Sequence, residues 1–133
     1  MLFYLKLYIL TVPVFFVIDM LWLGFIAKGF YREKLAAFLS PTVNWHAAII
    51  FYLLFIVGII FFAVAPARAK DSLFITAMYG ALFGFFTYAT YDLTNLATLK
   101  NWPLSVVVVD ILWGAVLCSV VASVSFLISK WIS

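Results

Sequence analysis

Three carboxylates lie inside long apolar stretches of this sequence: Asp19, Asp92 and Asp110. A charged side chain near the centre of a lipid bilayer costs about 2.5–3.5 kcal/mol on insertion scales, so an ionisable residue in such a stretch indicates a functional site by default. Carboxylates in that setting bind a proton, an ion or a polar headgroup. The alternative is structural, because a carboxylate also accepts hydrogen bonds that link neighbouring helices.

Asp92 lies in the most polar of these stretches. Four side chains follow the spacing i, i+3, i+4 and i+7 and therefore share one face of a helix: Tyr88, Tyr91, Asp92 and Asn95. The same face continues toward Gly80 and Gly84, whose spacing lets another helix approach closely. Since lipid cannot satisfy hydrogen bonds, we expect this face to point into a helical bundle.

Asp19 and Asp110 occur in two similar segments. A tryptophan follows each aspartate, Trp22 in the first segment and Trp113 in the second, so each pair shares one helix face. The similarity indicates either an inverted repeat or a coincidence, and the residues alone leave both interpretations open.

The composition places these residues in a membrane protein. Of the 133 residues, 68% are hydrophobic and only 10% are charged, whereas a soluble domain is nearer half apolar and a quarter charged. The net charge of +3 comes from residues that flank the apolar segments, which fits a lipid bilayer as the partner rather than nucleic acid. Cys118 is the single cysteine, so no internal disulfide can form.

Four apolar segments are long enough to cross a hydrocarbon core of ~30 Å as helices. They cover about residues 2–27, 44–65, 73–98 and 103–131. Between the first two, Tyr31, Leu35 and Phe38 share one face, which predicts a short interfacial helix that ends near Pro41. The sequence therefore predicts an all-α integral membrane four-helix bundle that forms a single transmembrane domain over residues 1–133.

The three aspartates are predicted to lie at one depth in the membrane. Asp19 and Asp92 lie about eight and six residues before the ends of their segments, and Asp110 lies about seven residues after the start of the fourth segment. At ~1.5 Å per residue, each lies roughly 9–12 Å below the same face. His46 and Lys100 flank that face and are either part of a site or ordinary interfacial residues. Three tryptophans are interpreted as interfacial residues without chemistry: Trp45, Trp102 and Trp131.

Other chemistries receive little support. The ligand types suit zinc or another divalent ion, but no H-x-x-H or E-x-x-H spacing accompanies them, so we predict no metal site. No phosphate-binding loop or dinucleotide fingerprint is present, and no particular cofactor is indicated. Whether the protein is an enzyme stays open.

The number of basic residues is equal on the two membrane faces, so charge does not decide the orientation of the chain. An even number of spans places both termini on one side of the membrane. Lysines and arginines are divided four and four between the faces, with Lys6, Arg68, Lys70 and Lys130 on the terminal side and Lys28, Arg32, Lys34 and Lys100 opposite. The positive-inside rule favours cytoplasmic termini only if Lys100 belongs to a site and is left out of the count.

A set of motifs carries a resemblance to a known family. They are Asp19-x-x-Trp22-Leu-Gly24, Phe30-Tyr31, the run from Tyr88 to Pro103, and Asp110-x-x-Trp113-Gly114. The chain resembles, over nearly its whole length, the bacterial predicted membrane proteins of domain-of-unknown-function family 2177. The resemblance implies a small multi-pass protein of the bacterial inner membrane and brings no reaction, substrate or catalytic residue.

The leading hypothesis is a polar, aspartate-lined site near one membrane face that binds or transports a small polar or cationic ligand. Its predicted residues are Asp19, Trp22, His46, Tyr88, Tyr91, Asp92, Asn95, Lys100, Asp110 and Trp113. One alternative is an intramembrane enzyme that modifies a lipid with an aspartate and His46 as acid and base. The other is an accessory subunit of a membrane complex that binds its partner through Gly80 and Gly84. Self-association into a homo-oligomer is compatible with so short a chain.

Overall fold

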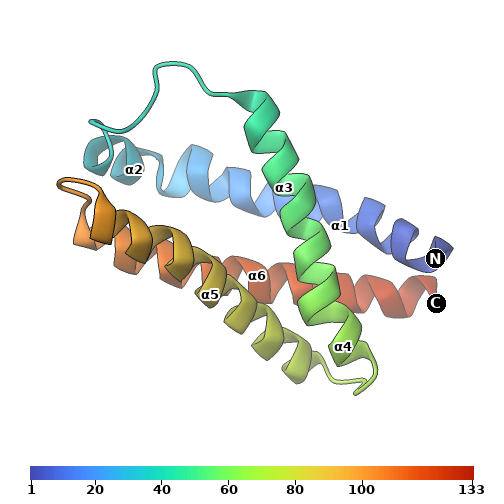
Figure 1. Ribbon diagram of the computed structural model, residues 1–133. Helices are drawn as coiled ribbons and strands as arrows, with labels where there is room; N and C mark the ends of the chain where they lie inside the picture. The colour runs from blue at the N-terminus through green and yellow to red at the C-terminus, as the bar shows by residue number, and fades with distance from the viewer.

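The computed structural model describes all of residues 1–133, and every regular element is helical (Figure 1). In chain order the elements are α1 (Leu2–Leu21), the π-helical turn η1 (Trp22–Ile26), α2 (Lys28–Lys34), α3 (Trp45–Ile59), the π-helical turn η2 (Ile60–Val64), α4 (Ala65–Arg68), α5 (Leu73–Thr98) and α6 (Leu104–Ile132). Four continuous stretches are long and apolar enough to span a membrane: Leu2–Ile26, Trp45–Arg68, Leu73–Thr98 and Leu104–Ile132. The predicted all-α fold with four membrane-spanning helices is therefore confirmed.

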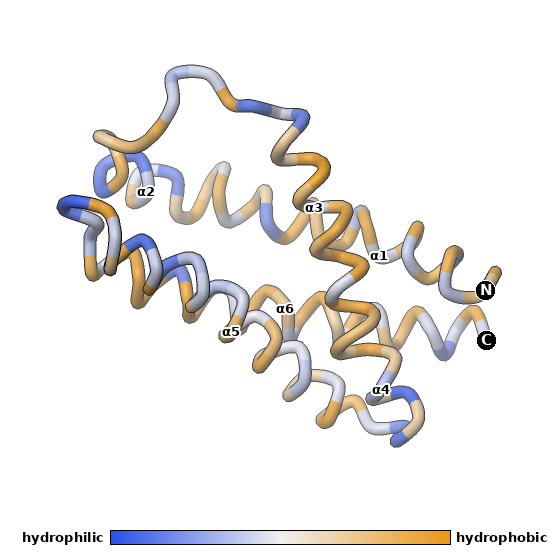
Figure 2. Tube along the Cα trace, in the orientation of Figure 1, coloured by the Kyte–Doolittle hydropathy of each residue, from blue (hydrophilic) through white to orange (hydrophobic).

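The two ends of the bundle differ in what they carry. Both termini and the linker after α4 lie at one end, which we call the terminal side (Figure 1). The segment with α2 and the turn between α5 and α6 lie at the other end, the loop side. Hydrophilic residues concentrate at these two ends, and the helices between them are mainly hydrophobic (Figure 2).

Polar side chains at the boundaries explain where two of the helices begin. The Asn44 side chain accepts a hydrogen bond from the backbone N–H of Ala47 at 3.2 Å and caps α3. Ser72 accepts one from Ile75 at 3.2 Å and caps α5. The start of each of these two spans is therefore encoded in its own local sequence.

The closest contact in the bundle is between α5 and α6, which run antiparallel (Figure 1). A Cβ atom on Gly84 would overlap the backbone carbonyl of Gly114, and one on Gly80 would meet the backbone of Cys118 and Ser119. Because only glycine lets two helix backbones approach this closely, the small-residue face of α5 packs inside the chain. The same face is therefore already occupied, and the accessory-subunit hypothesis loses the surface on which it depended.

The terminal side holds the main hydrophobic core. It joins buried residues of all four spans, among them Leu7, Phe15, Ile59, Leu117 and Phe126. Thr11 and Ser125 lie within it and share a hydrogen bond of 2.9 Å, so the polar atoms buried there are paired.

Helix α3 crosses the other three spans at an angle (Figure 1). Its buried residues are Phe55, Ile56 and Ile59, all in its second half, and η2 continues into the core. The residues of its first half are half-buried or exposed. On the loop side, therefore, α3 stands away from α5 and α6 and leaves space between the helices.

A second, smaller core closes the loop side. Leu35 from the end of α2 packs with Trp102, Val106 and Val107 at the start of α6. Phe38 adds a ring contact to Trp102, with centroids 5.1 Å apart. The predicted interfacial helix is present but ends at Lys34, because Leu35 leaves helical geometry as it enters this core. Trp102 is only 7% exposed, so its interpretation as a lipid-facing interfacial residue is wrong.

Candidate functional site

A cavity of ≈ 470 Å³ fills the space between the loop-side halves of the spans. Its walls are formed by Asp19, Leu23, Ala48, Phe51, Tyr52, Phe55, Thr87, Tyr88, Tyr91 and Asp110. Every one of the four spans contributes to it, and α3 can do so because its first half is held away from the bundle. Carboxylates and aromatic rings line the cavity, and no lysine, arginine or histidine does. Its electrostatic character is therefore negative.

Asp19 reaches the cavity because it continues the buried face of α1. The buried residues Leu7, Thr11, Phe15 and Asp19 follow one another at intervals of four along that helix. Asp19 is only 3% exposed, and its Oδ1 accepts a hydrogen bond from the indole N–H of Trp113 at 3.2 Å. One uncharged donor thus holds a carboxylate that is otherwise removed from solvent.

Asp110 is held by a chain of two donors, Tyr31 from α2 and Trp22 from the end of the first span. The Tyr31 hydroxyl donates to Asp110 Oδ1 at 2.8 Å, and the Trp22 indole N–H donates to the Tyr31 oxygen at 3.2 Å. Burial, followed by the negative charge of Asp110, raises the pKa of Tyr31 above its usual value, so this hydroxyl stays protonated and remains a donor. Trp22 also stacks on Trp113, with ring centroids 4.4 Å apart and planes 8° from parallel.

The two Asp–Trp pairs noted in the sequence therefore cross over in the structure. Trp113 of α6 bonds Asp19 of α1, and Trp22 at the end of the first span acts on Asp110 through Tyr31. The pairs bind across helices and not within them, which ties the two segments to one site.

Asp92 has a different environment from the other two aspartates. It is completely buried, it does not line the cavity, and neither of its oxygens meets an N–H or O–H donor of the protein. Along the antiparallel contact of α5 and α6, Gly80 faces Ala122, Gly84 faces Cys118 and Tyr88 faces Gly114, and the same register sets Asp92 opposite Asp110. The structure thus places Asp19 and Asp110 on the cavity wall and Asp92 behind Asp110.

None of these carboxylates has a positively charged partner. The protein has one salt bridge, between Lys130 and Asp71 at 2.7 Å, and it lies on the terminal side. No three His, Cys, Asp or Glu side chains are placed to hold a metal ion. The negative charge around the cavity is therefore not balanced by any group of the chain.

Comparison with known proteins identifies the family. The family described as "Predicted membrane protein (DUF2177)" matches residues 4–127. The chain belongs to this family. The match covers all of the residues that line the cavity and confirms the resemblance drawn from the sequence motifs. No curated protein and no solved structure matches the chain.

In this DUF2177 protein the residues predicted for the site fall into three groups. Asp19, Tyr88, Tyr91 and Asp110 line the cavity. Trp22 and Trp113 take part in the hydrogen bonds that hold Asp110 and Asp19, Asp92 lies behind Asp110, and Asn95 lies one turn beyond Tyr91 on α5, half-buried. His46 and Lys100 are exposed and do not line it.

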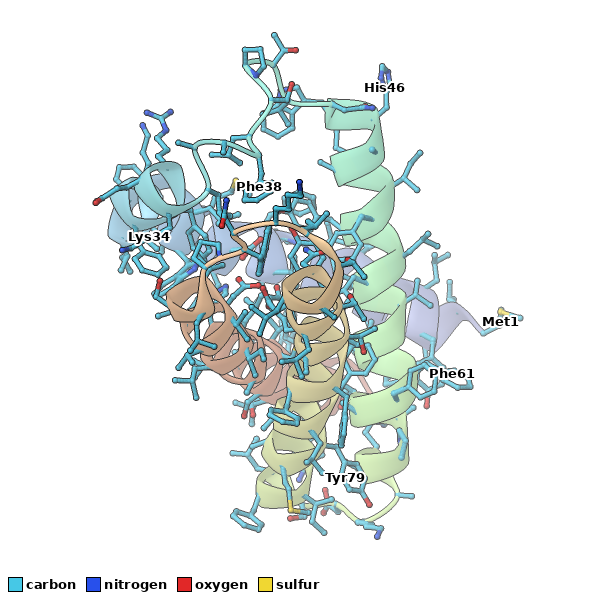
Figure 3. All side chains as sticks on the ribbon, turned by 60° about the vertical axis from the view of Figure 1, so that its left-hand side comes forward. Met1, Lys34, Phe38, His46, Phe61 and Tyr79 are labelled. Atoms are coloured by element: carbon cyan, nitrogen blue, oxygen red, sulfur yellow. The ribbon has the colours of Figure 1, made fainter.

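The position of His46 bears on the hypothesis of an intramembrane enzyme that modifies a lipid. His46 lies in the first turn of α3 and points away from the rest of the DUF2177 bundle (Figure 3). It makes no salt bridge and no side-chain hydrogen bond with an aspartate. An acid–base pair of an aspartate and His46 therefore has no geometric support.

Sequence reasoning missed Tyr31, which holds Asp110, and six of the ten residues that line the cavity: Leu23, Ala48, Phe51, Tyr52, Phe55 and Thr87. The sequence places Tyr31 on the apolar face of the predicted interfacial helix. In the structure this residue contacts α6 instead, because α2 folds over the start of that helix. Tyr52 lines the cavity beside Asp19. A signal existed for Tyr52, since it is the one polar side chain between His46 and Gly58.

Proposed function

We propose that the loop-side cavity of this membrane protein binds a small organic cation. The observation that carries the proposal is a pair of carboxylates, Asp19 and Asp110, on the wall of an aromatic cavity that has no basic side chain. An unbalanced carboxylate is costly at membrane depth, and a bound cation removes that cost.

The lining favours an organic cation over an anion or a bare metal ion. Two carboxylates repel an anion, and no basic residue offsets them. Rings of Phe51, Tyr52, Phe55 and Tyr88 present faces that attract a cation through their quadrupoles. Metal ions need several oxygen or nitrogen ligands converging on one point, which this wall does not supply. A volume of ≈ 470 Å³ lies within the usual range of small-molecule sites.

The rim of the cavity supports entry from outside the bundle. Leu23, Phe51 and Tyr91 line the cavity and are 38%, 50% and 54% exposed, so the opening lies among residues of α3, α5 and η1. A second hollow, of ≈ 590 Å³, lies on the terminal side between the first and second spans, but apolar and aromatic residues alone line it and it holds no carboxylate. The two hollows share no lining residue, so binding at the loop side is the supported step, and movement of the ligand across the membrane would require a path between them.

The experiment uses two ions of nearly equal size and opposite charge, tetraphenylphosphonium and tetraphenylborate. Equilibrium dialysis against the purified protein in a mild non-ionic detergent measures saturable binding of each ion. We expect the wild type to bind the phosphonium and not the borate. Asp19→Asn and Asp110→Asn should each weaken phosphonium binding about tenfold or more, because each removes an attraction of about 3 kcal/mol between unit charges ~6 Å apart at an effective dielectric constant of ~20, part of which desolvation offsets.

Asp71→Asn is the matched control, because it removes the same charge with the same substitution outside the cavity. It should leave phosphonium binding unchanged. Equal binding of the two ions, or phosphonium binding that is the same in all four proteins, would show partition into the detergent or the surface and would contradict the proposal.

We also propose that the protein resides in the bacterial inner membrane with both termini in the cytoplasm. The four-against-four count of basic residues becomes four against three if Lys100 is left out, and that supports cytoplasmic termini. Reporter fusions at Ser133 test the orientation: a reporter that is active only outside the cytoplasm would reverse it.

A further inference from the structure

The Asp92 side chain is the least satisfied polar group in the protein. It is 0% exposed, and both of its oxygens lack a donor, whereas Asp19 and Asp110 each accept at least one hydrogen bond. A buried carboxylate without a donor or a counter-ion is strongly disfavoured, and such a group binds a proton instead.

The group opposite it on α6 is a second carboxyl, that of Asp110, because Gly84 faces Cys118 and Tyr88 faces Gly114 along the same helix contact. Two carboxylates cannot bond to each other, since both are acceptors, but a carboxylic acid donates to a carboxylate. Like charges at such a separation also oppose simultaneous ionisation. A single proton between the two groups removes the repulsion and supplies the donor that Asp92 lacks.

We propose that Asp92 and Asp110 together form a binding site for one proton, which a cation entering the cavity displaces. The acid form belongs to Asp92, because Asp110 already accepts the Tyr31 hydroxyl and is the better stabilised as an anion. Asp110 then accepts two hydrogen bonds, one from Tyr31 and one from protonated Asp92.

The groups that face this pair contain no positive charge. Tyr31 approaches from α2, Asp19 from α1, and Tyr88 and Tyr91 from α5. Neither carboxyl has a salt bridge to a lysine, an arginine or a histidine. A proton, or a cation brought from outside, is therefore what can neutralise the pair.

Asp110 links the pair to the cavity because it belongs to both. A monovalent cation that enters beside Asp110 brings one positive charge, and the O–H bond of Asp92 breaks to release one proton to water. Net charge in the site is unchanged: one bound proton is exchanged for one bound cation. This exchange rests on the proposed function, whereas the shared proton does not.

The shared proton is tested by infrared spectroscopy of the purified protein at neutral pH, with no cation added. The carbonyl stretching band of a protonated carboxylic acid should be present in the wild type and in Asp71→Asn. It should be lost in Asp92→Asn. Absence of the band in the wild type, or its persistence unchanged in Asp92→Asn, would overturn the proton site.

The exchange is tested by adding tetraphenylphosphonium to weakly buffered protein with a pH indicator dye. We expect release of about one proton per phosphonium bound by the wild type, and an affinity that rises with pH by up to about tenfold per unit while the pair titrates. Asp92→Asn keeps an N–H donor for Asp110 but has no proton to release. Its binding should become independent of pH and occur without proton release.

The two arms separate failure of this inference from failure of the proposed function. An acid band that disappears in Asp92→Asn, in a protein that does not bind the phosphonium, supports the proton site and contradicts the cation site. Phosphonium binding that depends on Asp19 and Asp110 but releases no proton supports the cation site and overturns the exchange.

Discussion

The two ends of this bundle treat buried polar groups in opposite ways. On the terminal side, Thr11 and Ser125 bond to each other and Arg68 donates to Ser129 at 3.1 Å, so polar atoms connect helices and are satisfied. On the loop side, three carboxylates are buried or half-buried without a positive partner, and Asp92 has no donor at all. Residue type alone does not separate a structural link from a site. The difference lies in whether the protein supplies the partners.

The packing of the spans follows the same division. The main core joins all four spans on the terminal side, where the remaining hollow is lined by apolar and aromatic residues, while α3 diverges on the loop side and leaves the cavity that holds Asp19 and Asp110. We infer that the terminal side carries most of the stability and that the loop side carries the function. Five substitutions test this division, from the largest expected effect to the smallest.

Gly84→Ala should be the most damaging change. The new Cβ would overlap the Gly114 carbonyl, so α5 and α6 must separate, and we expect a loss of about 2–3 kcal/mol in the free energy of unfolding. Unfolding of the purified protein in mixed micelles measures it. Gly24→Ala is the control, because nothing lies within 4 Å of a Cβ there, and equal effects of the two would contradict the packing account.

Tyr31→Phe should reduce stability by about 1–2 kcal/mol, because Asp110 loses a donor and the Trp22 indole loses its acceptor. Tyr4→Phe is the control, since Tyr4 is 41% exposed and has no hydrogen bond through its hydroxyl. A Tyr31→Phe protein as stable as the control would show that the loop-side hydrogen bonds add nothing.

The same residue predicts an effect of alkaline pH. The pKa of Tyr31 is raised in the folded protein by burial and by Asp110, whereas in the unfolded chain it returns to its ordinary value of 10.0. Above that pH the unfolded chain releases the proton and the folded protein retains it, so stability falls as pH rises. Unfolding measured on both sides of that pH should show a smaller fall in Tyr31→Phe than in Tyr4→Phe.

A third test compares the stability effects of removing one polar group from the terminal side and one from the loop side. Thr11→Val breaks the Thr11–Ser125 hydrogen bond and should lower stability by about 0.6 kcal/mol, the average for such bonds between membrane helices. Asp19→Asn keeps an acceptor for the Trp113 indole and removes a buried charge, so stability should stay the same or rise. Stability lost in Asp19→Asn and kept in Thr11→Val would reverse the assignment of the two sides.

Asp71→Asn should have the smallest effect. Its salt bridge to Lys130 joins side chains that are 74% and 51% exposed, so water and salt screen it, and we expect a change of at most about 0.5 kcal/mol. The difference from wild type should shrink further in high salt. A large effect would mean that charge pairs at the membrane surface hold the terminal side together.

The parts of the site that the sequence predicted are those on continuous helices. The stripe from Tyr88 to Asn95 follows helical spacing, and alternating spans bring Asp19 and Asp110 to its depth, because the rise of a helix is regular. The positions of His46 and Trp102 could not be predicted in the same way. Each depends on a boundary where the chain leaves one helix and turns toward or away from the bundle.

The sequence could predict that the three aspartates lie at one depth, but not that only two of them line the cavity. Common depth is a one-dimensional property, and it does not say which side chains face each other around the bundle. The structure puts Asp19 and Asp110 on the cavity wall and Asp92 behind it. Helix rotation, which is set by packing, decides that arrangement.

The sequence by itself determined the four spans, the family and the polar band near one face. A chain in lipid must satisfy each backbone group within a helix or a closed barrel, and the length and unalternating apolar composition of these spans leave helices. Only the tertiary structure decided that α3 diverges, that Tyr31 folds back onto Asp110, and that Asp92 lacks a partner. These features depend on contacts between residues far apart in the chain, and no local pattern records them.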